Sequence, residues 1–231
     1  FLEAVQNYKK KDFKNAELIC YKILGINPYH FDSISLLATI SVINGNFDKA
    51  RELMLKAVEI QPRNKSALNN LGTTYRQLGK VKEAVNIYNK VLEIDPNHTN
   101  ANYNLGLIFY NLRELKTAKS YLQKTVKIQK NYALAFVNLA NVHVDLKEYK
   151  EARSYYQKAI GINPNLVSAH NNLGLIFKEL KEFQKAIQSY QQAISINPNY
   201  TNSINNLAHL LKEAQFNNVT KANSKNLKQL F

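Results

Sequence analysis

Asparagine is the residue whose side chain and regular spacing indicate a binding function in this chain. Five asparagines recur every 34 residues, at Asn70, Asn104, Asn138, Asn172 and Asn206. A primary amide both donates and accepts hydrogen bonds, so it can hold the N–H and C=O of a peptide backbone whatever the bound side chains are. Capping of helices or bonding between repeats would also explain part of the column. The column therefore predicts a row of contacts to an extended polypeptide, with an internal structural role as the alternative.

The other reactive residues do not form a catalytic arrangement. The chain has five histidines and a single cysteine, Cys20. No pair of histidines has the spacing of zinc ligands together with a third ligand, and nothing resembles a Ser-His-Asp arrangement. All seven glycines have a structural explanation, so none is left for a phosphate-binding loop. We therefore expect no enzymatic activity, no metal and no cofactor in these residues.

The same 34-residue period runs through the rest of the chain. Prolines mark it at positions 28, 62, 96, 164 and 198, and Lys130 occupies the one missing place. A column of small residues has the same spacing and consists of Ala16, Ala50, Ala84, Ala118, Ala152 and Ala186. A fixed period of this length is typical of stacked-repeat architectures.

Each period contains two stretches with apolar residues at i, i+3, i+4 and i+7, the pattern of an amphipathic helix. The expected pairs are 1–9 with 13–26, 31–44 with 47–60, 65–78 with 81–94, 99–112 with 115–128, 133–146 with 149–162, and 167–180 with 183–196, followed by a helix at 201–214. The expected fold is therefore all-α, with about six to seven helix-turn-helix repeats.

The repeat resembles the tetratricopeptide repeat. The residues that carry the resemblance are Leu71-Gly72, Tyr75, Ala84, Tyr88 and Pro96, and again Leu173-Gly174, Phe177, Ala186, Tyr190, Ala193 and Pro198. The resemblance implies a right-handed α-solenoid whose first helices line a concave groove. It divides residues 1–214 into repeats at about 1–30, 31–64, 65–98, 99–132, 133–166, 167–200 and a partial 201–214. Residues 215–231 would be a capping helix or a truncated repeat.

Some residues depart from the repeat pattern. The bulky residue that usually opens the motif is Asn102 in one repeat and His170 in another. Thr125 stands for a small residue and Lys130 for proline. We expect looser packing and a more flexible turn at these places.

The five asparagines lie opposite the packed stripe of the first helices, so we expect them to face the groove. The column is similar to the asparagine ladder of O-linked N-acetylglucosamine transferases and their bacterial relatives, in which the resemblance implies a grip on substrate polypeptide. Other side chains expected on this surface are Arg76, Tyr110, Asn141, Lys178 and Lys212. An apolar patch is expected at Leu36, Val42 and Ile43. It would receive a hydrophobic partner segment, support self-association or lie under a missing N-terminal element.

The formal net charge of +14 permits an acidic peptide, a nucleic acid or an anionic membrane surface as partner. A lysine column on the second helices is more typical of a solvated face than of a binding strip. No apolar run approaches the roughly 18 residues of a membrane span. No signal peptide is recognised, which favours a cytoplasmic location, although a start at Phe1 within an expected helix indicates a fragment.

Three functions follow, in decreasing order of support. The first is a protein-interaction scaffold that binds an extended peptide through the asparagine column, and an acidic peptide is among the expected partners. The second is the substrate-recognition region of a larger glycosyltransferase-like or sulfotransferase-like enzyme. Nucleic-acid binding through the outer lysines ranks last, because the groove is not strongly basic.

Overall fold

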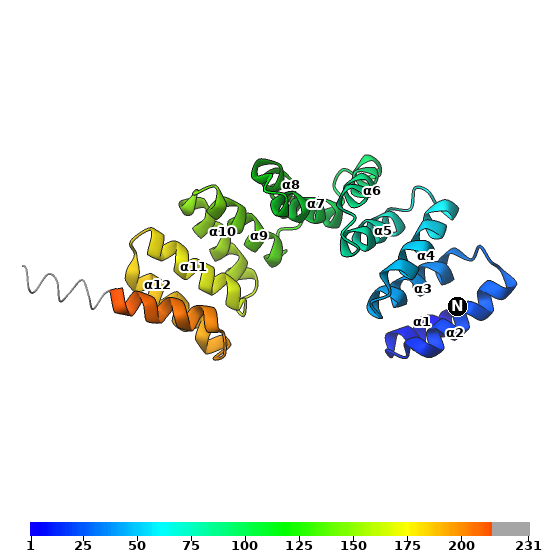
Figure 1. Cartoon of the computed structure of the whole chain (residues 1–231), viewed down its shortest axis with the longest axis horizontal. Coiled ribbons are helices and arrows are strands. Elements are labelled where there is room, and N and C mark those ends of the chain that lie inside the picture. The colour runs from blue at the N-terminus through cyan, green and yellow to red at the C-terminus, as the bar shows by residue number, and fades with distance from the viewer. Residues whose placement is uncertain (214–231) are drawn as a thin grey trace, which may run out of the picture. The chain divides into compact units, whose positions relative to one another are not determined.

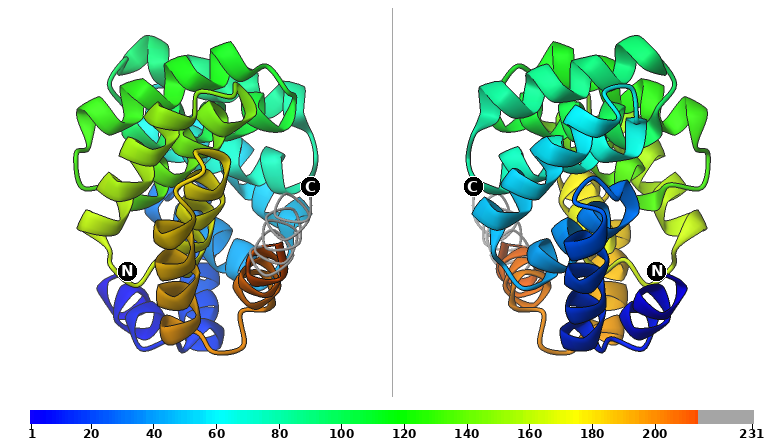
Figure 2. Two further views of the ribbon diagram at one scale, coloured as in Figure 1. Left: turned by 90° about the vertical axis from the view of Figure 1, so that its left-hand side faces the viewer. Right: turned by 90° about the vertical axis from the view of Figure 1, so that its right-hand side faces the viewer.

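The computed structural model describes residues 1–213 of the chain, and in that range it is built from helices joined by short connections (Figure 1). The side views of Figure 2 show the same all-helical construction. The helices are α1 (Leu2–Lys9), α2 (Phe13–Ile26), α3 (Phe31–Ile43), α4 (Phe47–Ile60), α5 (Lys65–Gln77), α6 (Val81–Ile94), α7 (Thr99–Asn111), α8 (Leu115–Ile128), α9 (Ala133–Asp145), α10 (Tyr149–Ile162), α11 (Val167–Glu179) and α12 (Phe183–Ile196). Residues 201–213 are also helical. The expected all-α fold of paired helices is confirmed, and the expected element at 215–231 lies outside the described residues.

From α3 onwards the first helix of a pair ends one residue earlier than the sequence pattern predicts, because that residue is the C-cap, whereas α1 ends at Lys9 as predicted. The two helices are then joined by a residue with positive φ. Gly45 and Gly79 supply it at φ 74° and 70°, as expected for a left-handed helix terminus. Elsewhere the same place is taken by residues that carry a Cβ, namely Lys11, Arg113, Lys147 and Lys181.

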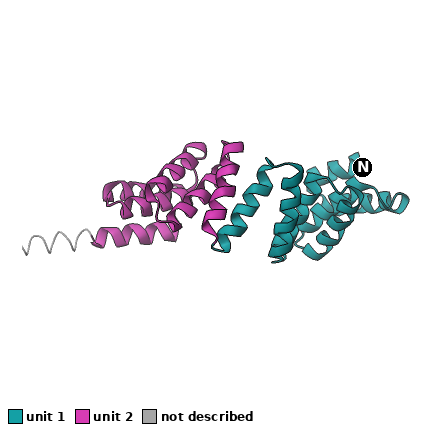
Figure 3. Cartoon of the chain, turned by 90° about the horizontal axis from the view of Figure 1, so that it is seen from above, with its two compact units in different colours: residues 1–113 teal, residues 114–231 magenta. Residues whose placement is uncertain are grey.

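The chain divides into two compact units, Phe1–Arg113 (unit 1) and Glu114–Phe231 (unit 2), coloured separately in Figure 3. In unit 1, α1 packs on α2, α3 on α4 and α5 on α6, and α7 contacts both α5 and α6. In unit 2, α9 packs on α10 and α11 on α12, while α8 lies against α9 and α10 against α11. Each unit is therefore a stack of helical hairpins that share their apolar faces.

Small residues set the distance between the helices of a hairpin. All six alanines of the 34-residue column are completely buried. A Cβ added to Gly72 would lie 2.8 Å from Cε1 of Tyr88, and one added to Gly174 would lie 2.5 Å from Cε1 of Tyr190. The tyrosine ring of each second helix thus packs directly on the glycine of its partner.

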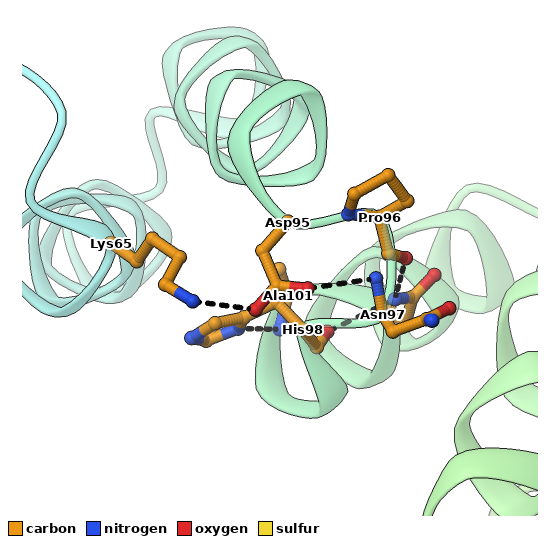
Figure 4. Close-up of polar contacts among 7 residues, drawn as sticks. Lys65, Asp95, Pro96, Asn97, His98 and Ala101 are labelled. Carbon is orange, nitrogen blue, oxygen red and sulfur yellow. Dashed lines mark hydrogen bonds and ion pairs between the residues drawn. The ribbon is translucent and has the colours of Figure 1, made fainter.

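The polar residues that open two of the repeats are bonded to the preceding turn. Asn102 is fully buried, and its Nδ2 donates to the carbonyl oxygens of Pro96 (3.2 Å) and His98 (3.0 Å) in the turn drawn in Figure 4. His170 makes the same contact through Nε2, 2.9 Å from the Pro164 carbonyl oxygen. Two hydrogen bonds thus take the place of the apolar contact of the usual bulky residue, while Oδ1 of Asn102 is buried without a partner among the described residues. The expected looser packing stays a prediction.

Candidate peptide-binding surface

Asn70 lies at a small pocket on the first helices of unit 1. The pocket has a volume of about 110 Å³ and is lined by Thr39 and Val42 from α3, Met54 from α4, and Asn70, Thr73 and Thr74 from α5. Cavities of about 150 Å³ accommodate benzene, so this pocket fits a smaller aliphatic side chain. The predicted groove residues Asn70 and Val42 are therefore brought together.

The hydroxyl groups of this pocket are already engaged. Each threonine donates to the carbonyl oxygen four residues earlier in its own helix: Thr39 to Ser35 (2.9 Å), Thr73 to Asn69 (3.0 Å) and Thr74 to Asn70 (2.9 Å). Thr73 also lies 3.0 Å from the Tyr88 hydroxyl. The carboxamide of Asn70, which is exposed, is left as the polar group available at an otherwise apolar pocket.

Asn104 occupies the equivalent position of the next first helix, α7, and is half-buried. Within residues 1–213, neither Asn70 nor Asn104 uses its side chain in a hydrogen bond, although Asn70 accepts one through its main chain. Because α5 and α7 are in contact, unit 1 carries two unengaged carboxamides on adjacent helices.

Arg76 and Tyr110 lie on the same two helices and are both half-buried. Nε of Arg76 is buried and has no hydrogen-bond partner among the described residues. Burial raises the pKa of Tyr88, and the nearby Thr73 hydroxyl and Arg76 guanidinium reduce that rise. Tyr88 is therefore neutral at physiological pH, and its hydroxyl lies beside that of Thr73.

The three residues of the expected apolar patch are all at least partly exposed on α3, and the patch stays a prediction. Leu36 is partly buried and packs against the buried cluster of Ala4, Cys20 and Leu37. Ile43 is about half exposed, at 49%, and does not line the pocket. Of the three residues, Val42 alone lines the pocket, because its position on α3 turns it towards α5.

In unit 2 the carboxamides are used in a network between helices. The Tyr156 hydroxyl of α10 donates to Oδ1 of Asn141 on α9. Nδ2 of Asn172, on α11, lies 3.3 Å from both Asn141 Oδ1 and the Tyr156 hydroxyl. Asn172 and the predicted groove residue Asn141 therefore tie one hairpin to the next.

The network continues through Asn171. Its Nδ2 donates to Oδ1 of Asn172 at 3.1 Å, and its Oδ1 accepts from the Ser203 hydroxyl and from Nδ2 of Asn206, each at 3.0 Å. Asn171 is only 4% exposed. Asn172 and Asn206 therefore have the internal structural role that the sequence left as the alternative, since both bond to neighbouring helices. Asn138, the remaining member, is half-buried on α9.

The predicted cations of unit 2 differ in their environment. Nζ of Lys178 lies 3.2 Å from Glu213 and 3.4 Å from Nδ1 of His209, so its charge is partly compensated. Lys212 is exposed. Sequence reasoning did not assign roles to Thr73, Met54 and Asn171; the position of Asn171 beside the asparagine column was the available signal.

Models of the tetratricopeptide repeat match residues 167–200, 99–132, 72–112 and 140–181, which together span more than half of the chain. The chain belongs to the tetratricopeptide repeat family. A model of subunit 3 of the anaphase-promoting complex, or cyclosome, matches residues 9–91. Proteins of the repeat family are protein-interaction scaffolds.

Several solved structures share the fold. MamA is 25% identical with a TM-score of 0.65, covering 70% of this chain and 94% of its own. YrrB, described as a tetratricopeptide repeat protein with an unusual peptide-binding site, is 22% identical with a TM-score of 0.66, covering 80% and 96%. PilF of Pseudomonas aeruginosa is 20% identical with a TM-score of 0.80, covering 90% and 95%. A search of curated proteins found no match.

These comparisons do not show the special resemblance to O-linked N-acetylglucosamine transferases, which stays a prediction. Among residues 1–213 no cluster of three or more His, Cys, Asp or Glu side chains is placed to hold a metal ion. None of the helices described here has the length and apolar character needed to cross a bilayer.

Proposed function

We propose that this chain is a protein-interaction scaffold that holds an extended peptide segment against the first helices of unit 1. The observation that carries the proposal is the free carboxamide of Asn70 at the edge of an apolar pocket. This combination offers a backbone contact and a side-chain contact at one place, which is how extended peptides are commonly recognised.

The two carboxamides of unit 1 supply the backbone contacts. Asn70 and Asn104 each offer a donor and an acceptor, and packed helices lie roughly 10 Å apart, about three residues of extended chain. A peptide bound to both would present every third residue to the same surface. An aliphatic side chain between those contacts enters the pocket beside Val42 and Met54.

The surrounding charge favours a neutral or acidic segment. Arg76 is half-buried on α5 and its Nε has no partner among the described residues. The guanidinium of Arg76 places a positive charge on α5, the helix that carries Asn70, and this charge attracts a carboxylate or carbonyl oxygen of a peptide and repels a cationic peptide. The peptide-binding site that the published description assigns to YrrB is consistent with this use of the fold.

The test begins with peptides selected from a random nine-residue phage library against the whole chain. The Asn70→Ala/Asn104→Ala double variant should weaken binding of a selected peptide by roughly tenfold or more, because each lost hydrogen bond contributes about 1 kcal/mol. Val42→Phe, which fills the pocket, should weaken the same peptide independently. Circular dichroism checks that helicity is retained.

The matched control is Asn86→Ala/Asn89→Ala, which removes two exposed carboxamides from the second helix α6. It should leave the peptide dissociation constant unchanged. Equal affinity of the Asn70/Asn104 variant and the wild type, or an equal loss in the control, would reject the proposal.

A further inference from the structure

A second pocket lies in unit 2, among α8, α9 and α10. Its volume is about 450 Å³, and it is lined by Val126, Lys127, Lys130, Phe136, Tyr155, Lys158 and Ile162. This volume falls within the roughly 300–1,000 Å³ typical of ligand pockets. Neither the asparagine column nor the proposed peptide site of unit 1 contributes to it.

The pocket combines an aromatic wall with a basic rim. The rings of Phe136 and Tyr155 stack with their centroids 6.3 Å apart and their planes 30° apart. Nζ of Lys158 lies 5.3 Å from the centroid of the Tyr155 ring, in the range of a cation–π contact. Lys127, Lys130 and Lys158 are exposed, and among residues 1–213 none of them forms an ion pair.

The equivalent place in unit 1 shows what is special here. There the pocket is about 280 Å³ and is lined by Pro62, Arg63, Leu68, Lys90, Glu93 and Ile94. Four of these residues, Pro62, Leu68, Lys90 and Ile94, lie 68 positions before Lys130, Phe136, Lys158 and Ile162. Unit 2 therefore has a lysine for Pro62 and a ring for Leu68. It also has no acidic residue in its lining, whereas Glu93 offsets one of the two cations in unit 1.

We propose that the unit 2 pocket binds an acidic peptide segment carrying one aromatic side chain. The ring packs against Phe136 and Tyr155, and neighbouring carboxylates lie beside the three lysines. Charge complementarity selects the acidic partner, because three lysines without an ion pair among residues 1–213 lie beside an apolar wall, and the lining contains no acidic residue. The proposal does not depend on peptide binding in unit 1.

A nucleic acid fits this pocket less well. Single-stranded nucleic acids are held by a basic groove that follows the backbone, with successive bases stacked on aromatic side chains, whereas Phe136 is only 7% exposed and the three lysines gather at a single pocket. Lysine also lacks the planar fork with which arginine holds phosphate through two bonds. A peptide with an aromatic side chain between carboxylates contacts both the aromatic wall and the lysines of the rim.

The probe is a fluorescein-labelled peptide with one Phe between two Glu-Asp pairs, measured by fluorescence anisotropy with the whole chain at low salt. Two reference ligands are the same peptide with Gly for Phe and a labelled oligothymidine. The Phe peptide should bind more tightly than both, and its affinity should fall as salt screens the lysines. No detectable binding of the Phe peptide, equal binding of the Gly peptide or tighter binding of oligothymidine would overturn the proposal.

The variant Lys127→Gln/Lys130→Gln/Lys158→Gln should weaken the Phe peptide by about tenfold or more, since each rim charge contributes modestly. Its control, Lys22→Gln/Lys56→Gln/Lys82→Gln, removes the same charge from exposed positions of unit 1 and should keep most of the affinity. Phe136→Leu introduces the residue type that Leu68 has in unit 1, and it should remove the preference for the Phe peptide over the Gly peptide. An equal loss in the two lysine variants would mean attraction by net charge alone and would contradict a pocket-specific site.

Discussion

The two units use the same asparagine column in different ways. In unit 1, Asn70 and Asn104 make no side-chain hydrogen bond among the described residues, and Asn70 lies at a pocket. In unit 2, Asn172 and Asn206 are bonded to neighbouring helices. A residue repeated at a fixed period therefore has a fixed position but no fixed role.

A single position explains much of the difference. The tyrosines Tyr88 and Tyr156 are equivalent, and each brings a hydroxyl to the first helix of its hairpin. In unit 1 that hydroxyl meets Thr73, whose own hydroxyl donates to its own helix. In unit 2 it meets Asn141, whose longer carboxamide also reaches Asn172 of the next hairpin. The neighbour thus decides whether the carboxamide of the following repeat is engaged.

The largest expected difference in the free energy of unfolding is between alanine variants of Asn171 and of its unit 1 counterpart, Asn69. Asn171→Ala removes the acceptor of Ser203 and Asn206 and the donor to Asn172, so unfolding in urea should show a loss of roughly 2–3 kcal/mol. Asn69→Ala should cost less, because Oδ1 of Asn69 is buried without a partner in the described structure. Equal losses would mean that the network does not distinguish the units.

A smaller effect, of opposite sign, is expected at Tyr190. Its hydroxyl is buried without a described partner, because Leu175 stands where Thr73 and Asn141 supply one. Tyr190→Phe should therefore stabilise the fold by about 1 kcal/mol, whereas Tyr156→Phe should destabilise it by a similar amount. Burial also raises the pKa of Tyr190 to about 12.

The raised pKa adds a pH dependence. The folded state keeps the Tyr190 proton that the unfolded chain releases near its ordinary pKa of about 10. Ionisation of Tyr190 therefore leaves the free energy of unfolding unchanged below about pH 10 and lowers it as the pH rises through about 12. Between pH 9 and 11 the wild type should lose about 1 kcal/mol more than Tyr190→Phe; parallel curves in urea unfolding would contradict this.

The smallest effect on stability is expected from Thr73→Asn, which gives unit 1 the residue type of Asn141. The new carboxamide stands 31 positions before Asn104, as Asn141 does before Asn172. Capture of Asn104 should stabilise the fold by less than about 1 kcal/mol and weaken a selected peptide although Asn70 and Asn104 are unchanged. Undiminished peptide affinity, with a hydrogen bond to Asn104 verified by a crystal structure, would argue against a role for Asn104.

The fold was predictable because each repeat presents the same local signals. The proline period, the alanine column and the two amphipathic stripes placed the described helices to within about a residue at either end. The state of each carboxamide was not predictable, since it depends on short side chains about 30 residues away in sequence, such as Asn141 for Asn172. The same holds for Leu36, whose burial depends on packing against α1 and α2.

The residues with positive φ at the hairpin turns account for part of the positive charge of the chain. Of the six residues with positive φ in the described chain, two are glycines and the other four are Lys11, Arg113, Lys147 and Lys181. The left-handed conformation costs a residue with a Cβ about 1 kcal/mol. Glycine is therefore favoured at these turns, but other residues are tolerated. Because all four substitutes are cationic, part of the +14 formal charge sits at corners of the scaffold. Overall isoelectric point is consequently a poor guide to what the binding surfaces of this chain prefer.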